Sequence, residues 1–382
     1  MACRFVEGND IHLLETGKEF FPALIEAIQN ARYEIFLETY IYAEDTSGKA
    51  VAKALRAAAK RGIKTHLLLD GFGSNQLSHA FIAALQADGV QVLFFRPQGK
   101  KGFPFKLLRR LHRKIALIDD HIAFVGGINI QDDFSPNPLP YPRLDYAVSI
   151  RGPVLADIRK EVARLWRLAS FRTLKIKRYA PDRPHFVPPL QGHMKAALVV
   201  RDNFRHHKDI EEAYLDAIDR AKESIIIANA YFLPGHKFRH ALKSAVKRGV
   251  NVKLLMQGQI EYFWAYYASH ALYRELLEGG IEIYDYTLSF MHGKAAVIDC
   301  KWATVGSSNI EPLSFFHARE ANIVVEDQAF SRTLHQRLLH AIEAGSIAVT
   351  IENLSDSYWE TLWLRTNYFL LSRLAQLSGW AD

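Results

Sequence analysis

The sequence predicts an α/β fold in which one unit, a mixed sheet flanked by helices, occurs twice. Residues 27–42 (AIQNARYEIFLETYIY) align with residues 217–232 (AIDRAKESIIIANAYF), and residues 54–71 (ALRAAAKRGIKTHLLLDG) align with residues 241–258 (ALKSAVKRGVNVKLLMQG). Each copy reads as an amphipathic helix, an apolar strand, a loop, a second helix and another strand. Two common βαβ units can resemble each other by chance, but a motif that recurs at one fixed offset favours a duplication in pseudo-two-fold arrangement.

Local signals mark the boundaries of these units. The second helix of each copy ends at Gly62 or Gly249, because glycine commonly closes a helix. We expect residues 153–169 to form a helix with Pro153 in its first turn. The sequence therefore predicts an N-terminal domain over residues 1–175, a proline-rich linker over 176–192, a C-terminal domain over 193–350 and an amphipathic helix over 351–382.

Composition limits the compartment and the partners. The 382 residues are 49% apolar and 23% charged, and Lys and Arg exceed Asp and Glu by 48 − 41 = 7. This balance is typical of a folded protein with anionic partners such as nucleic acid, phospholipid headgroups or acidic substrates. Two cysteines, Cys3 and Cys300, exclude a disulfide framework and a cysteine-rich zinc site. We expect a reducing compartment, no signal peptide and no transmembrane helix, so that any work on a membrane is done at its surface.

The strongest signal is a polar motif that occurs twice. Residues 111–119 read LHRKIALID and residues 291–299 read MHGKAAVID. The first set, His112, Lys114, Asp119, Gly126 and Asn129, recurs 180 residues later as His292, Lys294, Asp299, Gly306 and Asn309. Five residues at fixed spacing match by chance at about one starting position in a million. In each copy a polar turn separates two short apolar runs, which predicts a β-hairpin. Two hairpins that carry these polar residues only by chance are a poor explanation of the repeat.

These residue types suit a phosphodiester. His112 and Lys114 lie two apart on a predicted strand, so they share a face. Lysine supplies a positive charge and asparagine a neutral donor for phosphate oxygens. One histidine can attack phosphorus while a second protonates the departing alkoxide. Because each copy supplies one histidine, we infer that the duplication completes one shared active site.

Each histidine needs a partner that fixes its tautomer. Asp145 lies 33 residues after His112, and Glu320 lies 28 residues after His292, both at the start of an apolar strand. We assign them as histidine-orienting residues; the alternative is a pair of ordinary strand-edge acids. Asp119 and Asp299 belong to the catalytic motif, although their place at a turn favours a structural role over proton transfer.

The repeated pattern H-x-K-x₄-D-x₆-G-x₂-N resembles the phospholipase D superfamily. The segments GGINI, GSSNI and AREANIVVED are similar to those of bacterial cardiolipin synthases, in particular the shorter B type without membrane-spanning helices. The resemblance implies a transferase that needs neither metal nor cofactor. It also implies that Lys114, Lys294, Asn129 and Asn309 hold the phosphate. Gly127 stands where the superfamily pattern has serine.

The resemblance further implies two chemical steps. One histidine becomes a phosphatidyl-histidine as a glycerol alcohol departs from phosphatidylglycerol. A second phosphatidylglycerol then attacks through its free hydroxyl and gives cardiolipin. The family habit favours His112 as the nucleophile, and phosphatidylethanolamine is an alternative donor.

A basic and apolar segment before the first motif predicts contact with an anionic bilayer. Residues 100–114 read KKGFPFKLLRRLHRK, and the residues assigned to the membrane are Phe103, Phe105, Lys106, Leu107, Arg109 and Arg110. Each cation near such a surface contributes about 1 kcal/mol. A basic loop that steers phosphate groups or binds nucleic acid is the alternative. The aromatic stretch 261–277 is either a core helix or the lining of an acyl-chain groove.

The sequence thus predicts a peripheral enzyme on the cytoplasmic face of the bacterial cell membrane. A phospholipase D-type hydrolase, which would use water as acceptor, carries the same motifs. A phosphodiesterase or nuclease of the same superfamily is a further alternative, but aliphatic residues within the basic segment favour lipid over nucleic acid. A scaffold would not need paired histidines. The oligomeric state is not predicted.

Overall fold

The computed structural model describes residues 3–96, 110–134, 140–173, 188–202, 206–260, 263–311 and 318–354. The first half of the chain forms strands and helices in alternation. They are β1 (Val6–Glu15), α1 (Thr16–Gln29), β2 (Glu34–Thr39), α2 (Thr46–Lys60), β3 (Lys64–Asp70), α3 (His79–Ala87), β4 (Gln91–Phe95), β5 (Arg110–Leu111), β6 (Lys114–Ile118), β7 (Ile122–Gly126), β8 (Tyr146–Arg151) and α4 (Leu155–Thr173).

The second half repeats this succession. It comprises β9 (Met194–Arg201), α5 (Asp209–Arg220), β10 (Ser224–Asn229), α6 (His236–Lys247), β11 (Asn251–Gln257), α7 (Phe263–His270), α8 (Tyr273–Glu278), β12 (Glu282–Tyr286), β13 (Lys294–Ile298), β14 (Trp302–Gly306), β15 (Ala318–Glu326), α10 (Gln328–Gly345), β16 (Ser346–Val349) and the 3₁₀ turn η2 (Ile351–Asn353). The predicted α/β fold with a duplicated unit is confirmed.

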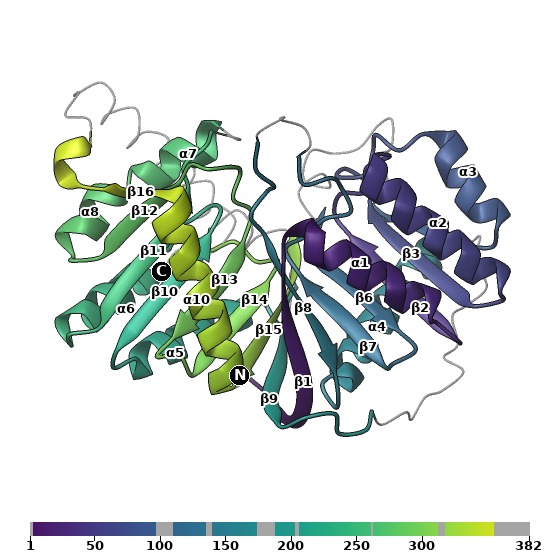
Figure 1. The fold of residues 1–382 in the computed structure, drawn as a ribbon, viewed down its shortest axis with the longest axis horizontal. Coiled ribbons are helices and arrows are strands. Elements are labelled where there is room, and N and C mark those ends of the chain that lie inside the picture. The colour runs from purple at the N-terminus through teal and green to yellow at the C-terminus, as the bar shows by residue number, and fades with distance from the viewer. Residues whose placement is uncertain are drawn as a thin grey trace.

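All these strands belong to one mixed sheet, with helices on both of its faces (Figure 1). The first half contributes the order β1-β8-β7-β6-β2-β3-β4, and the second half contributes β9-β15-β14-β13-β10-β11-β12-β16. The two orders match strand for strand up to β16. The halves join where β1 pairs antiparallel with β9, through Val6 opposite Ala196 and Asn9 opposite Met194. This continuity between the two sheets was not predicted.

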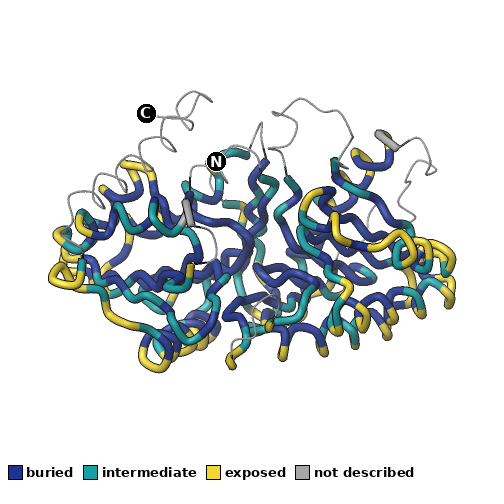
Figure 2. Tube along the Cα trace, turned by 90° about the horizontal axis from the view of Figure 1, so that it is seen from above, coloured by how far each residue is buried: buried dark blue, intermediate teal, exposed yellow. Residues whose placement is uncertain are grey.

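The apolar runs of the sequence become strands that are covered on both faces. Residues 35–39 of β2 and 225–229 of β10 are all buried, as expected of strands that helices cover on both sides. The parallel triplets β2-β3-β4 and β10-β11-β12 are each followed by the predicted hairpin, β6–β7 or β13–β14. Figure 2 shows the buried residues mainly in the interior of the molecule and the exposed residues mainly on its outer parts.

Apolar packing unites the two halves. One core forms in each half alone, around Leu24 and Leu55 in the first and around Ile218 and Leu242 in the second. A third core combines both halves, with Trp166 of α4 and Leu334 of α10 in a single cluster. Burial of this shared surface favours the assembled pair of units over either unit alone.

The structure confirms the predicted closing glycines, divides one predicted helix and does not describe two other predicted segments in full. Gly62 and Gly249 follow the ends of α2 and α6 with φ of 88° and 90°, as predicted for closing glycines. The stretch 261–277 is not one helix, because α7 and α8 are separate, and Ala268, Tyr273 and Leu276 are buried in the core. Residues 176–187 of the linker and 355–382 of the C-terminal helix lie outside the described residues.

The aspartates of the two motifs hold the sheet together at the end away from the histidines. Asp119 lies in the β6–β7 turn with φ of 54°, and its carboxylate accepts the backbone N–H groups of Arg32, Tyr33 and Glu34 at 2.6, 2.8 and 2.9 Å. Asp299 accepts those of residues 222–224 at 2.8 to 2.9 Å. Five residues of extended strand place Asp119 roughly 17 Å from Lys114. These contacts of Asp119 and Asp299 are structural, which agrees with the role that their place at a turn favours over proton transfer.

Among the described residues, no helix combines the length and the apolar character that are needed to cross a bilayer.

Replacement of Asp119 by alanine is expected to lower the free energy of unfolding by about 2–3 kcal/mol, because three amides lose a charged acceptor and alanine disfavours positive φ. Asp119→Asn, which keeps one acceptor oxygen, is expected to lose less. Urea denaturation measures both, with Glu7→Ala on the exposed face of β1 as the control. An Asp119→Ala variant as stable as the wild type would contradict the structural role.

Candidate active site

The two motif histidines meet where the halves join. Their ring centroids lie 6.5 Å apart, with the ring planes at 69°. Backbone bonds to the opposite half fix both approaches: the His112 N–H donates to Arg319 O at 3.0 Å, and the His292 N–H donates to Leu144 O at 2.8 Å. β5 also pairs with β15 of the other half. The structure therefore brings the two histidines into one site.

Each histidine is bonded to a carboxylate of the other half. His112 Nδ1 lies 2.8 Å from Glu320 Oε1, and His292 Nδ1 lies 2.7 Å from Asp145 Oδ2. Both predicted orienting residues thus reach a histidine, but not the one that precedes them in sequence. Because Nδ1 is engaged in both rings, Nε2 is the atom of each ring that remains for chemistry.

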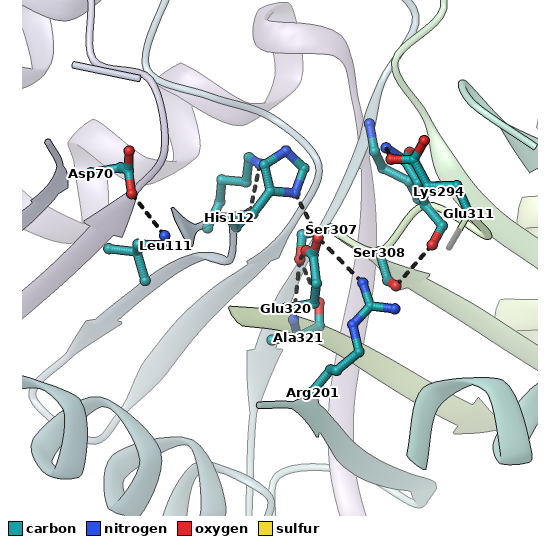
Figure 3. A network of polar contacts seen from close by, with 12 residues as sticks. Asp70, Leu111, His112, Arg201, Lys294, Ser307, Ser308, Glu311, Glu320 and Ala321 are labelled. Carbon is teal, nitrogen blue, oxygen red and sulfur yellow. Dashed lines mark hydrogen bonds and ion pairs between the residues drawn. The ribbon is translucent and has the colours of Figure 1, made fainter. Parts of the chain in front are cut away.

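The two carboxylates differ in their surroundings. Figure 3 shows Glu320 between His112, the Ser307 hydroxyl, which donates to Glu320 Oε2, and Arg201, whose Nη2 lies 3.5 Å from Oε1. Burial raises the pKa of Glu320, but His112 and Arg201 outweigh it and hold this pKa below its usual value. Glu320 is therefore ionised.

The charged form of Asp145 is less well stabilised by its surroundings than that of Glu320. Burial raises its pKa to about 7 against the opposing charge of Lys294, and its Oδ1 accepts the Tyr146 N–H at 2.8 Å. A Cβ on Gly127 would lie 2.1 Å from Asp145 Oδ1. Glycine stands in place of serine here because the carboxylate occupies the space that a side chain would need.

Burial favours the neutral form of both imidazoles. It lowers the pKa of His112 to about 4, with Glu320 opposing and Lys114 adding to the shift. Burial also lowers the pKa of His292 well below its ordinary value, and Lys294 and Lys114 reinforce it. A neutral imidazole is the form that can act as a nucleophile or accept a proton.

The motif lysines are buried in the same site. Lys114 Nζ donates to His112 O at 2.6 Å, and Lys294 Nζ donates to His292 O. Burial lowers the pKa of Lys114 to about 7, which Glu320 opposes and the charge of Lys294 reinforces. An anion placed between the two lysines would reverse this effect, so the site is suited to bind one.

The two motif asparagines are held differently. Asn129 Oδ1 accepts the Ile41 N–H at 3.1 Å, which leaves the amide NH₂ group for a ligand. Asn309 Nδ2 instead donates to Glu311 Oε1 at 3.2 Å. Glu311 was not predicted, and only its position two residues after the motif asparagine, where the first half has Gln131, could have drawn attention to it.

Sequence reasoning missed other neighbours of the histidines. The Tyr40 ring lies edge-on to His112, with centroids 5.0 Å apart, and Lys114 Nζ lies 5.5 Å from the centroid of the same ring. Asp70 accepts the Leu111 N–H at 2.8 Å. Both sit at the ends of strands in the repeated segments, so the alignment of the two halves contained the signal.

Of the residues assigned to the membrane, only Arg110 is described. Phe103, Phe105, Lys106, Leu107 and Arg109 lie outside the described residues. The Arg110 guanidinium lies 4.9 Å from the ring centroid of the exposed Phe72, and its Nη1 lies 3.9 Å from Asp70 Oδ1.

Two α/β units around one pair of carboxylate-bound histidines and one pair of buried lysines define a phospholipase D-like enzyme. A family model described as "Cardiolipin synthase, PLD-like domain" matches residues 24–166 and 214–342. The chain belongs to this cardiolipin synthase family. The predicted resemblance and the predicted enzyme class, a phosphatidyltransferase, are thereby confirmed.

Curated relatives match along the whole chain. It is 41% identical over 384 residues to cardiolipin synthase B of Salmonella typhi and 39% identical over 383 residues to cardiolipin synthase B of Escherichia coli; each match covers 100% of this chain and 92% of the relative. Among solved structures, phosphatidylserine synthase of Haemophilus influenzae has the same fold, with a TM-score of 0.73, 14% identity and coverage of 98% of this chain and 96% of that chain.

The depressed pKa of His112 predicts a pH-dependent stability. Between pH 4 and 6.5 the unfolded chain binds a proton at this residue that the folded chain, with a pKa of about 4, does not. The His112 contribution to stability therefore rises with pH across this window and is lost as pH falls, by about 3 kcal/mol in total.

Urea denaturation at several pH values between 4 and 7 tests this by comparing the wild type with His112→Asn. The difference between their free energies of unfolding is expected to shift in favour of the wild type as pH rises. His12→Asn, at an exposed side chain, is the matched control. Parallel pH profiles for wild type and His112→Asn would contradict the burial argument.

Proposed function

We propose that the chain makes cardiolipin by transferring the phosphatidyl group of one phosphatidylglycerol to the free hydroxyl of a second, with release of glycerol. The observation that carries this proposal is the pair of histidines that face each other at 6.5 Å, each oriented by a carboxylate of the opposite half. The cardiolipin synthase B relatives, which match over the full chain, support the choice of product.

In the first step, His112 Nε2 attacks phosphorus and forms an N–P bond while the P–O bond to the glycerol headgroup breaks. His292 donates its Nε2 proton to the departing oxygen and takes over, at Nδ1, the proton of the Asp145 carboxyl group, whose pKa burial raises to about 7. In the second step, His292 takes the proton of the incoming hydroxyl, whose oxygen attacks phosphorus and breaks the N–P bond. Lys114, Lys294, Asn129 and Asn309 hold the non-bridging oxygens during both steps.

The unequal carboxylates support this division of roles. Glu320 is held ionised, so it stabilises the positive charge on a phosphorylated His112 ring. The pKa of Asp145, raised to about 7 by burial, lets it share a proton with His292, which suits a residue that gives and takes a proton. These partners support the proposal that His112 is the nucleophile and His292 the proton donor and acceptor.

Substitution of either histidine by alanine is expected to lower cardiolipin formation by at least about 10³-fold, because both act in the same two steps. Mass spectrometry of lipids after incubation with phosphatidylglycerol vesicles in metal-free buffer measures the product, and phosphatidylethanolamine is added as a second donor in a parallel mixture. His12→Ala is the control.

The same assay separates the alternatives. Cardiolipin together with glycerol supports transfer, and phosphatidic acid would identify a hydrolase instead. Absence of any lipid product would redirect the search to nucleic acid. Turnover that survives in His112→Ala or His292→Ala would contradict the mechanism.

We also propose that the enzyme binds the cytoplasmic face of the cell membrane through the end of the sheet at which the histidines lie. Their side chains are only 16% and 13% exposed, so a lipid headgroup must leave the bilayer surface to reach them. Four large apolar residues, Phe72, Phe134, Tyr141 and Ile260, are exposed in the loops after β3, before β8 and after β11, at this end.

The chemistry of these loops fits an anionic bilayer. Tyr141 precedes Pro142, whose carbonyl accepts the Ser289 hydroxyl near the second histidine, and Arg110 stacks on Phe72. Aromatic rings beside a cation suit the boundary between headgroups and acyl chains. The predicted contacts within residues 103–109 extend this proposal and stay predictions.

Combined replacement of Phe72, Phe134 and Tyr141 by serine is expected to weaken binding to phosphatidylglycerol vesicles at least about tenfold, since each inserted ring contributes on the order of 1 kcal/mol. Vesicle sedimentation measures the binding. The matched control replaces Tyr33, which is 51% exposed against 48% for Tyr141, and Phe171 of α4. Equal loss in both variants, or in neither, would contradict docking at this end.

A further inference from the structure

Side-chain oxygens at equivalent places in the two halves hold the backbone just before each histidine. Asp70 is the last residue of β3, and its Oδ2 accepts the N–H of Leu111 at 2.8 Å (Figure 3). Gln257 is the last residue of β11, and its Oε1 accepts the N–H of Met291 at 3.1 Å. Asp70 and Gln257 are themselves aligned in the repeat and are both buried.

These bonds have a direct bearing on where the histidines sit. Leu111 and Met291 are buried, so an amide without an acceptor there would cost about 1–3 kcal/mol. The bond fixes the peptide plane one residue before the histidine, while the bond from Nδ1 fixes the ring. Together they leave the histidine backbone and ring little freedom to rotate away from the phosphorus.

The two acceptors differ in charge. Asp70 is a carboxyl group that accepts three backbone N–H groups and lies 3.9 Å from the Arg110 guanidinium, whereas Gln257 is a neutral amide. The adjoining positions differ too: Tyr40 packs against His112, and the aligned residue of the second half is Ala230. The halves thus share one frame and differ in the groups beside it.

We propose that Asp70 and Gln257 are positioning residues for His112 and His292, and that the negative charge that Asp70 carries and Gln257 lacks contributes to the electrostatic difference between the two halves of the site. The inference rests on the proposed function for the roles of the histidines. The rival interpretation is that Asp70 only closes its own turn, because its Oδ1 also accepts the N–H groups of Phe72 and Gly73 at 2.9 and 3.1 Å.

Four variants separate hydrogen bonding from charge. Asp70→Ala and Gln257→Ala remove the acceptor, so kcat with phosphatidylglycerol vesicles is expected to fall about tenfold to a hundredfold with KM within about twofold. Asp70→Asn keeps an acceptor oxygen but loses the negative charge. Gln257→Glu keeps an acceptor oxygen and gains a negative charge. Both are expected to retain kcat within about threefold of the wild type near pH 6.

The charge variants are expected to move the pH profile in opposite directions. An anion near the buried Lys114 favours its protonated form, so Asp70→Asn should shift the alkaline limb of kcat to lower pH. By the same sign, Gln257→Glu places an anion beside the second histidine and its lysine, and should shift that limb to higher pH. If the alkaline limb of the kcat–pH profile shifts in neither variant, the electrostatic part of the proposal is overturned.

A readout without turnover separates this inference from the proposed function. In protein labelled with ¹⁵N-histidine, Asp70→Ala is expected to shift the ring signals of His112 and leave those of His292, and Gln257→Ala the reverse. The histidine variants assign the signals. Unchanged ring signals in both alanine variants would overturn the positioning roles, whereas a wild type that yields no cardiolipin would overturn the proposed function alone.

Discussion

The exchange of carboxylates between the halves is the interaction on which the rest of the site depends. Glu320 orients His112 and Asp145 orients His292, so neither half contains an oriented histidine by itself. The pairing of β1 with β9, the contact of β5 with β15 and the shared core hold the halves in the register that this exchange needs. A continuous sheet is therefore part of the catalytic apparatus, because a slip at the junction would separate both pairs at once.

The buried charges explain why the site is made for an anion. Two lysines and two histidines lie close together away from water, and burial disfavours the charged form of Lys114 and of both histidines. A phosphodiester that enters between them supplies the missing negative charge and stabilises the protonated lysines. Binding energy is in this way concentrated at the phosphate group, where charge is redistributed during transfer.

The sequence predicted what depends on residue type and local spacing. The duplicated unit and the two hairpins follow from periodicity and from motif residues at equal offsets. Asp145 and Glu320 were singled out because each begins an apolar strand at a comparable place in its half. The crossed pairing did not follow, because it is set by contacts between segments 147 and 208 residues apart. Asp119 shows that shared spacing in a motif does not imply a shared site. It lies at the other end of strand β6 from Lys114 and bonds the backbone there. Asp70 was overlooked because a single acid at a strand end has many possible uses.

Duplication supplies symmetry, whereas a transfer reaction needs two unlike histidines: one that holds the phosphatidyl group and one that moves protons. The structure contains the differences at matched positions. Gly127 faces Asp145 where Ser307 bonds Glu320, and Asn129 bonds backbone where Asn309 bonds Glu311. None of these changes disturbs the strands that carry the motifs. The shared frame preserves the facing geometry, while burial raises the pKa of Asp145 and the charges around Glu320 lower its pKa. Two copies of one motif can therefore take different parts in one reaction.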